Sequence, residues 1–179
     1  MQSLRELYNV GRGPSSSHTI APERAAKLFA QRHPNADGFQ VVLYGSLAKT
    51  GRGHGTDRVL AETLPRKTEI VFDEQTETPH PNTMDFSAYR GGALLGRLRV
   101  YSVGGGEIRI EGEPDRTPPP VYRFHTYDQI KAHCAEHQIR IPQYVRQEEG
   151  IGIMTFLDGI WQRMRQSIRE GLDAEGELP

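Results

Sequence analysis

The run of residues 112–120, Gly-Glu-Pro-Asp-Arg-Thr-Pro-Pro-Pro, constrains the fold of this chain more than any other stretch. Proline has no backbone N–H and a fixed φ, so this run cannot continue a helix or a central strand. Such a composition is typical of a boundary or linker between domains. It predicts one domain over residues 1–120 and a helical extension over residues 121–179.

The part before this boundary predicts an α+β domain with a mainly antiparallel sheet and helices packed on it. Alternating apolar residues and an excess of strand formers indicate strands at residues 39–44, 69–72, 94–103 and 107–111. Three glycines at 104–106 separate the last two strands. Residues 73–93 are polar, so a loop is expected there.

Two helices are expected in the same part. Pro22 fits only a first helical turn, so the first helix begins close to residues 18–19. A second helix, capped by Thr56 or Asp57, runs to residue 64.

The part after the boundary predicts helices at residues 127–137 and at about 148–172. The second helix carries apolar residues on one face, at alternating steps of three and four: Met154, Leu157, Trp161, Met164 and Ile168. This face packs either on the domain itself or on a partner or a missing domain. The closing Gly-Glu-Leu-Pro is typical of an entry into further chain, so we expect a fragment of a longer protein.

The totals exclude several classes of protein. The chain has 22 Lys and Arg against 23 Asp and Glu, which gives no general attraction to nucleic acid or to an anionic membrane. No apolar run has the ~20 residues of a membrane span, and the N-terminus lacks the apolar core of a signal peptide. We therefore expect a cytoplasmic protein. The single cysteine, Cys134, cannot form an internal disulfide and cannot alone hold a metal cluster or a structural zinc.

A serine-rich stretch, Gly-Arg-Gly-Pro-Ser-Ser-Ser-His-Thr at residues 11–19, is the first candidate site. The first turn of a helix presents unpaired N–H groups and a partial positive charge, and serine hydroxyls add further donors. The combination suits a carboxylate or a phosphate, while His18 can move a proton near neutral pH. The alternative is an ordinary serine cap within a polar loop.

A glycine-rich stretch, Gly-Arg-Gly-His-Gly-Thr-Asp at residues 51–57, is the second candidate. Its glycines allow the backbone to approach a ligand closely, and His54 lies between two of them. His54 is therefore a candidate base or ligand, and the alternative is a flexible turn with an exposed histidine.

Two weaker stretches complete the candidates. His80-Pro81-Asn82 offers two polar side chains on a backbone stiffened by proline. Residues 101–107, Tyr-Ser-Val-Gly-Gly-Gly-Glu, form either a tight turn or a wall of backbone N–H groups facing a ligand. No helix is expected after them, so they do not match a dinucleotide-binding pattern.

These four stretches occur in an order that resembles the iron–sulfur-dependent L-serine dehydratases, or L-serine deaminases. The matching blocks are Gly-Pro-Ser-Ser-Ser-His-Thr followed by Pro22-x-Arg-Ala-Ala, residues 44–57, His80-Pro81-Asn82 with Met84 and Phe86, and residues 101–106. Residues 147–179 also resemble the helix that leads into the catalytic α domain of the family. The resemblance covers nearly the whole chain but only the front part of the enzyme.

The resemblance implies a lyase of amino-acid catabolism that converts L-serine into pyruvate and ammonia without pyridoxal phosphate. It implies a four-iron, four-sulfur cluster with three cysteine ligands and one open iron, which acts on the serine hydroxyl as it leaves. It also implies a front, or β, domain similar to the allosteric substrate-binding domain of D-3-phosphoglycerate dehydrogenase. The cluster cysteines belong to the α domain, so no metal ligand is expected in this chain.

The partners implied are L-serine, the chain's own α domain or a separate α subunit, and a second copy in a homodimer of the full enzyme. No nucleic acid or membrane partner is expected, and this chain alone is not expected to dehydrate serine. The alternative is a non-catalytic regulatory domain that binds serine or another small carboxylate.

Site roles follow from the resemblance. His54 is the candidate for the base that removes the α-proton, and His18 is the second candidate for proton transfer. The hydroxyls before the first helix grip the substrate carboxylate or cover the cluster side of the pocket. The candidates for substrate binding are Ser15, Ser16, Ser17, Thr19, Gly53, Thr56, Asp57, His80, Asn82 and Gly105.

Overall fold

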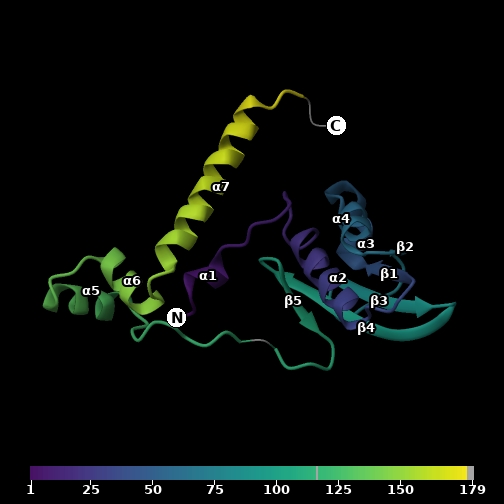
Figure 1. Cartoon of the computed structure of the whole chain (residues 1–179), viewed down its shortest axis with the longest axis horizontal. Helices are drawn as coiled ribbons and strands as arrows, with labels where there is room; N and C mark the ends of the chain where they lie inside the picture. Colours follow the sequence, from purple (N-terminus) through teal and green to yellow (C-terminus); the bar gives the residue numbers. More distant parts are fainter. Residues whose placement is uncertain (116, 177–179) are drawn as a thin grey trace. The chain divides into compact units, whose positions relative to one another are not determined.

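The chain folds into two compact units in a computed structural model that describes residues 1–115 and 117–176 (Figure 1). The larger unit is Gly11–Arg116 and contains the sheet. The smaller unit combines Met1–Val10 with Thr117–Pro179 and is helical. The first ten residues thus fold with helices that lie more than a hundred residues later in the sequence.

The larger unit is built on one five-stranded sheet with the strand order β2-β1-β3-β4-β5. Strands β1 and β2 are parallel, and the other three pairs are antiparallel. The prediction of an α+β fold with a mainly antiparallel sheet is confirmed. The strands are β1 (Gly38–Tyr44), β2 (Lys67–Asp73), β3 (Thr83–Arg90), β4 (Ala93–Gly104) and β5 (Glu107–Ile110).

Strand β3 corrects the prediction of a loop over residues 73–93. It pairs with both β1 and β4 and is therefore a central strand. Met84, Phe86 and Ala88 are fully buried on one face and alternate with Asp85 and Ser87 on the other. The polar half of this alternation concealed the strand, because Asp85 is tolerated only through its pairing with a residue of β4.

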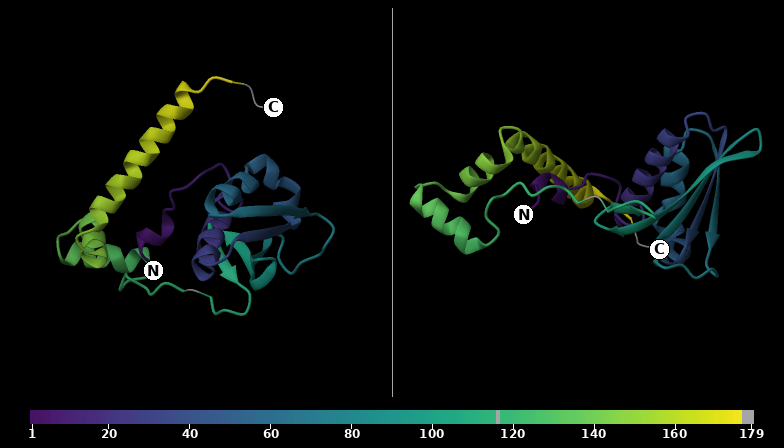
Figure 2. Two further views of the ribbon diagram at one scale, coloured as in Figure 1. Left: turned by 45° about the vertical axis from the view of Figure 1, so that its right-hand side comes forward. Right: turned by 90° about the horizontal axis from the view of Figure 1, so that it is seen from below.

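Helices α2 (Ile20–Arg32), α3 (Gly45–His54) and α4 (Thr56–Thr63) cover one face of the sheet (Figure 2). The predicted positions of α2 and α4 are confirmed, but Gly55, rather than Thr56 or Asp57, occupies the cap position of α4. The core lies between these helices and the sheet, and each fully buried apolar side chain stabilises it by roughly 1.5–3 kcal/mol. Its largest members are Phe29, Leu43, Leu47, Leu60, Met84 and Phe86.

Helix α3 corrects the prediction of an open, glycine-rich turn around His54. Glycine suits position 51 of this helix, because the packing is tight there. A Cβ atom added to Gly51 would lie 3.2 Å from the Phe72 ring and 3.3 Å from the Thr56 hydroxyl. It ends at Gly55, whose left-handed φ of 71° suits a helix C-terminus. His54 is thus the last residue of a packed helix.

The smaller unit contains α1 (Leu4–Leu7), α5 (Tyr127–Glu136), α6 (Ile141–Glu149) and α7 (Ile153–Asp173). Helix α5 is as predicted. The helix expected at about 148–172 is confirmed as α7, but it begins only at Ile153, because Gly150, with a φ of 81°, ends α6. None of the helices formed by the described residues has the length and hydropathy needed to cross a bilayer.

A carboxylate at the end of α6 ties the N-terminal segment into this unit. Glu149 accepts hydrogen bonds from the Ser3 hydroxyl and the Leu4 backbone N–H, both at 2.6 Å, and from the Tyr122 hydroxyl at 2.8 Å. On α7, the predicted apolar face is largely uncovered, with Trp161 53% and Ile168 56% exposed.

Candidate functional site

The predicted site residues lie at the edge of the sheet where β1 ends and where both α2 and α3 begin. His18 precedes α2 and is only 7% exposed. Its Nδ1 lies 3.0 Å from the Ser15 hydroxyl and 3.1 Å from the Ser17 hydroxyl. Its Nε2 lies 2.9 Å from the hydroxyl of Thr50 on α3. Both ring nitrogens are therefore engaged by hydroxyl groups.

Two buried threonines hold the backbone of this loop. The Thr56 hydroxyl donates to the His18 carbonyl at 2.7 Å. The Thr19 hydroxyl shares its one proton between the carbonyl of Ser15, at 2.8 Å, and that of Arg12. Both threonines are fully buried. Among the predicted binding residues, Thr19 and Thr56 thus use their hydroxyls to support the loop.

The serine loop feeds directly into α2. The Ser16 carbonyl accepts a hydrogen bond from the Ala21 N–H at 3.0 Å, and the Ser15 carbonyl accepts one from the His18 N–H at 3.1 Å. Thr19 occupies the cap position of the helix but makes no side-chain cap bond. The first turn of α2 thus uses its Ala21 N–H to bind the loop itself, and Pro22 has no N–H to offer a ligand.

His54 lies beside His18, with 4.7 Å between the ring centroids. It is half-buried and lines a hollow together with Gly53, Asp57 and the Gly13-Pro14 segment. Within the part of the chain that the structure describes, neither of its ring nitrogens has a hydrogen-bonding partner. Of the two histidines, His54 is the one whose nitrogens are free to meet a ligand.

Burial sets the protonation of His18. It lowers the pKa of the imidazole below its ordinary value; a hydrogen bond with the Ser46 backbone partly opposes this, and the charge of His54 lowers the pKa further. Because an ordinary histidine has a pKa of about 6.5, His18 is neutral at neutral pH. A neutral ring has one N–H donor and one acceptor nitrogen.

The His80–Asn82 loop joins the same edge through the start of α3. The Ser46 N–H donates to the Pro81 carbonyl at 2.7 Å. Gly45 has a φ of 53°, and a side chain there would lie 2.5 Å from the Pro81 oxygen, so only glycine fits. Nδ1 of the His80 ring accepts a hydrogen bond from the Asn82 N–H at 3.1 Å.

Two buried oxygens at this edge are unpaired. Among the described residues, Asn82 Oδ1 and Ser102 Oγ are buried without a hydrogen-bonding partner. The two residues are neighbours, because the Ser102 N–H donates to the Asn82 carbonyl at 2.9 Å. A buried polar atom without a partner costs stability, so these oxygens suit a bound polar group.

The triple-glycine turn between β4 and β5 lies against the first residue of α2. A side chain at Gly106 would lie 2.7 Å from an Ile20 carbon, and the Arg24 guanidinium donates to the Gly106 carbonyl at 2.9 Å. The predicted binding residue Gly105 lies in this turn, with a φ of 60°. The turn therefore borders the edge that carries His18.

The described residues do not fit an iron–sulfur cluster or a zinc ion. Within residues 1–115 and 117–176, no group of three or more His, Cys, Asp or Glu side chains could hold a metal ion. Cys134 is buried in the helical unit, where it packs with Tyr122 and Tyr144. A cluster needs several thiolates, and this chain has one.

Three polar residues of this edge were absent from the predicted site: Ser46, Thr50 and Ser102. Ser46 and Thr50 lie on α3, which the sequence did not predict as a helix. The spacing of Ser46, Thr50 and His54 by four places them on one helix face, which is the signal that a helical interpretation would have provided. Ser102 lies within the candidate stretch 101–107, but the sequence does not show that its side chain is buried.

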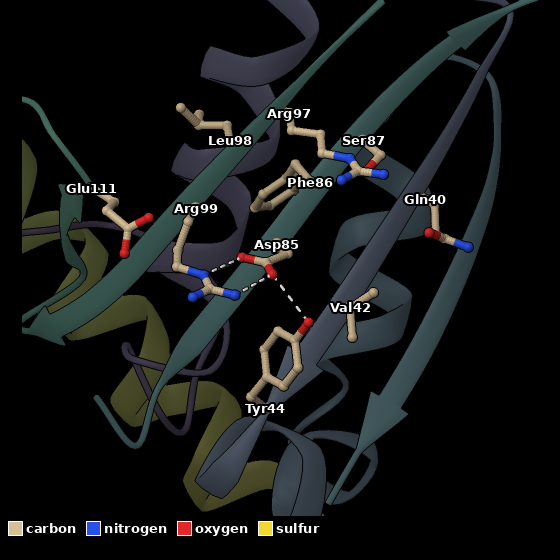
Figure 3. A pocket seen from close by; sticks show the side chains of 10 residues that line it. All are labelled: Gln40, Val42, Tyr44, Asp85, Phe86, Ser87, Arg97, Leu98, Arg99 and Glu111. Carbon is tan, nitrogen blue, oxygen red and sulfur yellow. Dashed lines mark hydrogen bonds and ion pairs between the residues drawn. The ribbon is translucent and has the colours of Figure 1, made fainter. Parts of the chain in front are cut away.

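A second polar hollow lies on the open face of the sheet and contains none of the predicted site residues (Figure 3). Asp85 accepts two hydrogen bonds from Arg99, each at 2.7 Å, and one from the Tyr44 hydroxyl at 3.0 Å. The carboxylate raises the pKa of Arg99, and burial together with Asp85 raises the pKa of Tyr44. These groups satisfy one another.

Comparison with known proteins assigns the front of the chain. Residues 3–65 match the family described as serine dehydratase beta chain. The matched stretch contains His18 and His54, the serine loop and the whole of α3 and α4.

Curated relatives extend the similarity along the chain. The chain is 29% identical to "L-serine dehydratase 2" of Escherichia coli, covering 100% of this chain and 51% of that protein. It is 30% identical to an "L-serine dehydratase" of Streptomyces coelicolor, covering 99% of this chain and 51% of that protein. A relative of the same name from Mycobacterium bovis is 47% identical over 61% of this chain and 33% of that protein. The chain spans about half the length of the first two of these relatives.

Proposed function

Because this chain belongs to the L-serine dehydratases through its beta-chain domain, we propose that it is the front part of an enzyme that deaminates L-serine to pyruvate and ammonia. The observation that carries the proposal is the His18–His54 pair beside the hydroxyls of Ser15 and Ser17, within the stretch that matches the family. The pair offers proton transfer, and the hydroxyls at the start of α2 offer donors to a carboxylate.

In this proposal His54 is the base that takes the α-proton of serine. Its nitrogens have no hydrogen-bonding partner among the described residues, and it lines a hollow open to a ligand. His18 is less suited to that step, since hydroxyl groups engage both of its nitrogens. His18 instead orients the hydroxyls of Ser15 and Ser17.

The substrate carboxylate binds, in this proposal, to the hydroxyls of Ser15, Ser16 and Ser17. The unpaired oxygens of Asn82 and Ser102 suit the ammonium or hydroxyl group of the amino acid. Gly53 and Asp57 line the hollow beside His54, and in this proposal His80 and Gly105 also border the bound substrate.

The iron–sulfur cluster implied by the family has no ligands in the described part of this chain. We propose that its cysteines belong to an α domain that follows in a longer chain or to a separate α subunit, and that the full enzyme is a homodimer. No pyridoxal phosphate takes part in this proposal. The chain alone then carries only part of the active site.

The test is anaerobic pyruvate formation from L-serine, with iron added, for two proteins. One is this chain alone, and the other is this chain joined to the coding sequence that follows it or co-produced with an α subunit. Activity only in the completed protein supports the proposal. Inactivity of a completed, folded and cluster-loaded protein contradicts it.

The same preparation of the chain alone decides the alternative, a non-catalytic domain that binds a small carboxylate. Calorimetry with L-serine is the measurement. A half-site binds serine weakly or not at all, whereas a regulatory domain binds it without any partner.

A further inference from the structure

The hydroxyl of Thr50 lies between two groups and has one proton to donate. It is 2.8 Å from the Ser46 carbonyl oxygen, one helical turn earlier, and 2.9 Å from His18 Nε2. The Ser46 carbonyl oxygen can only accept, so in the arrangement that keeps this bond the hydroxyl proton goes to Ser46. Thr50 then has only its lone pairs for His18, and the Nε2 of the ring must carry the hydrogen.

The other nitrogen of the ring follows from the same reasoning. A neutral imidazole carries one N–H, so Nδ1 of His18 presents a lone pair. This lone pair faces the hydroxyls of Ser15 and Ser17, which lie 3.0 and 3.1 Å away and 3.2 Å from each other. One of the two serines donates to Nδ1, and the pair is fixed in its orientation.

We propose that Thr50 is a positioning residue, which holds neutral His18 in the Nε2–H tautomer so that Nδ1 orients the hydroxyls of Ser15 and Ser17. The tautomer rests on hydrogen-bond geometry alone. Its consequence for turnover rests on the proposed function, because Ser15 and Ser17 are the proposed carboxylate-binding hydroxyls.

The position of Thr50 makes the proposal testable. Thr50 is exposed on α3, so replacing its hydroxyl with a methyl group removes no core contact. The chain also offers a matched control, because Thr63 on α4 donates to the Val59 carbonyl at 2.7 Å with the same i to i−4 geometry and contacts no imidazole. Thr63→Val removes an equivalent helix bond without touching His18.

The first experiment is long-range ¹H–¹⁵N NMR of the histidine rings in this 179-residue chain, at about pH 8, where His18 is neutral. A nitrogen that carries hydrogen and one that carries a lone pair have well-separated ¹⁵N shifts. For wild type, Thr50→Ser and Thr63→Val we expect a protonated Nε2 and a lone pair on Nδ1. For Thr50→Val we expect the two shifts to move toward each other as the second tautomer becomes populated.

Two results overturn the proposal, the first through the tautomer and the second through the role of Thr50. One is a protonated Nδ1 in the wild-type chain, which needs no variant to fold. The other is an unchanged His18 spectrum in a Thr50→Val chain whose backbone amide spectrum reports the native fold.

The second experiment measures pyruvate formation in the completed enzyme. Thr50→Val should lower kcat/KM about tenfold, the equivalent of one lost hydrogen bond, and Thr50→Ser should restore it. Thr63→Val should match wild type. If Thr50→Val shifts the tautomer but not kcat/KM, the positioning role is overturned. If the completed wild-type enzyme forms no pyruvate, the proposed function fails while the NMR result still decides the tautomer.

Discussion

The sheet unit carries two polar clusters that differ in how far they satisfy themselves. On the open face of the sheet, the carboxylate of Asp85 is bound by the Arg99 guanidinium and by the Tyr44 hydroxyl (Figure 3). At the edge of the sheet, His18 and His54 lie 4.7 Å apart, and no carboxylate pairs with either ring in the described part of the chain.

The difference separates a cluster that stabilises the fold from one that suits a ligand. Within the group formed by Asp85, Arg99 and Tyr44 each charge has a partner, so these three side chains leave nothing for another molecule to satisfy. In the edge cluster, burial lowers the pKa of His18, and the buried oxygens of Asn82 and Ser102 have no partner among the described residues. Groups held in this state at a cost to stability are typical of functional sites.

The largest effect that would test this contrast is loss of turnover in a His54→Ala variant of the completed enzyme. A positioned base contributes about 10²-fold or more, so turnover should fall by at least that factor. Anaerobic pyruvate formation measures it. His137→Ala is the control, because His137 is exposed on the helical unit and lies outside the edge cluster. Turnover close to wild type in the folded His54 variant would remove this residue from the mechanism.

The next effect concerns the open face and is one of stability. Asp85→Ala leaves the guanidinium of Arg99 and the hydroxyl of Tyr44 without their acceptor, where the Arg99 and Asp85 side chains are 31% and 27% exposed. We expect the free energy of unfolding to fall by about 2 kcal/mol, measured by urea denaturation of this chain.

The matched control for this variant is a second paired arginine that is more exposed. Glu113 binds Arg32 through two hydrogen bonds, at 2.7 and 3.2 Å, and the two side chains are 44% and 39% exposed. Glu113→Ala should cost less stability than Asp85→Ala, because water replaces an exposed pair readily. If the completed Asp85 variant is folded but inactive, the division into a structural and a functional cluster is wrong.

The sequence predicted most of what positions the edge cluster. Pro22 located the start of α2, and the alternation of residues 39–44 located β1, so the place where β1 ends and α2 begins was predictable. The serine loop and both histidines were identified from their residue types. The local sequence was therefore sufficient to locate a helix or strand whose own residues carry a clear helical or alternating pattern.

The wrong predictions have one physical cause. Contacts with residues far away in the sequence stabilise residue types that are unfavourable in a strand or a helix by themselves. The central strand β3 carries Asp85, which needs Arg99 from another strand. Helix α3 contains three glycines, and packing against Phe72 makes Gly51 acceptable there. The first ten residues join the helical unit through Glu149, 145 residues away from Leu4. Thr50 was missed for the same reason, since its role depends on a helix that was not predicted.

The smallest expected effect is a pH dependence of stability that belongs to the edge cluster alone. His18 has a lowered pKa in the folded chain, so between that value and the ordinary pKa of about 6.5 the unfolded chain binds more protons. Its contribution to stability is therefore fully present above about pH 6.5 and declines as the pH falls below it. The Arg99 guanidinium on the open face shows no such change, because its raised pKa keeps it charged.

Urea denaturation of this chain at about pH 7.5 and 5.5 measures that dependence. The wild-type chain should lose more stability over this interval than a His18→Gln variant, because glutamine does not titrate. His137→Gln removes an exposed histidine and should leave the dependence unchanged. An equal loss in the wild-type and His18→Gln chains would mean that the pKa of His18 does not change on folding. A smaller loss in the wild-type chain would mean that folding raises this pKa. The hydroxyls around the ring would then be arranged for an imidazolium, with Nδ1–H donating to a serine, and the contrast between the two clusters would lie in their hydrogen bonds rather than in their charge.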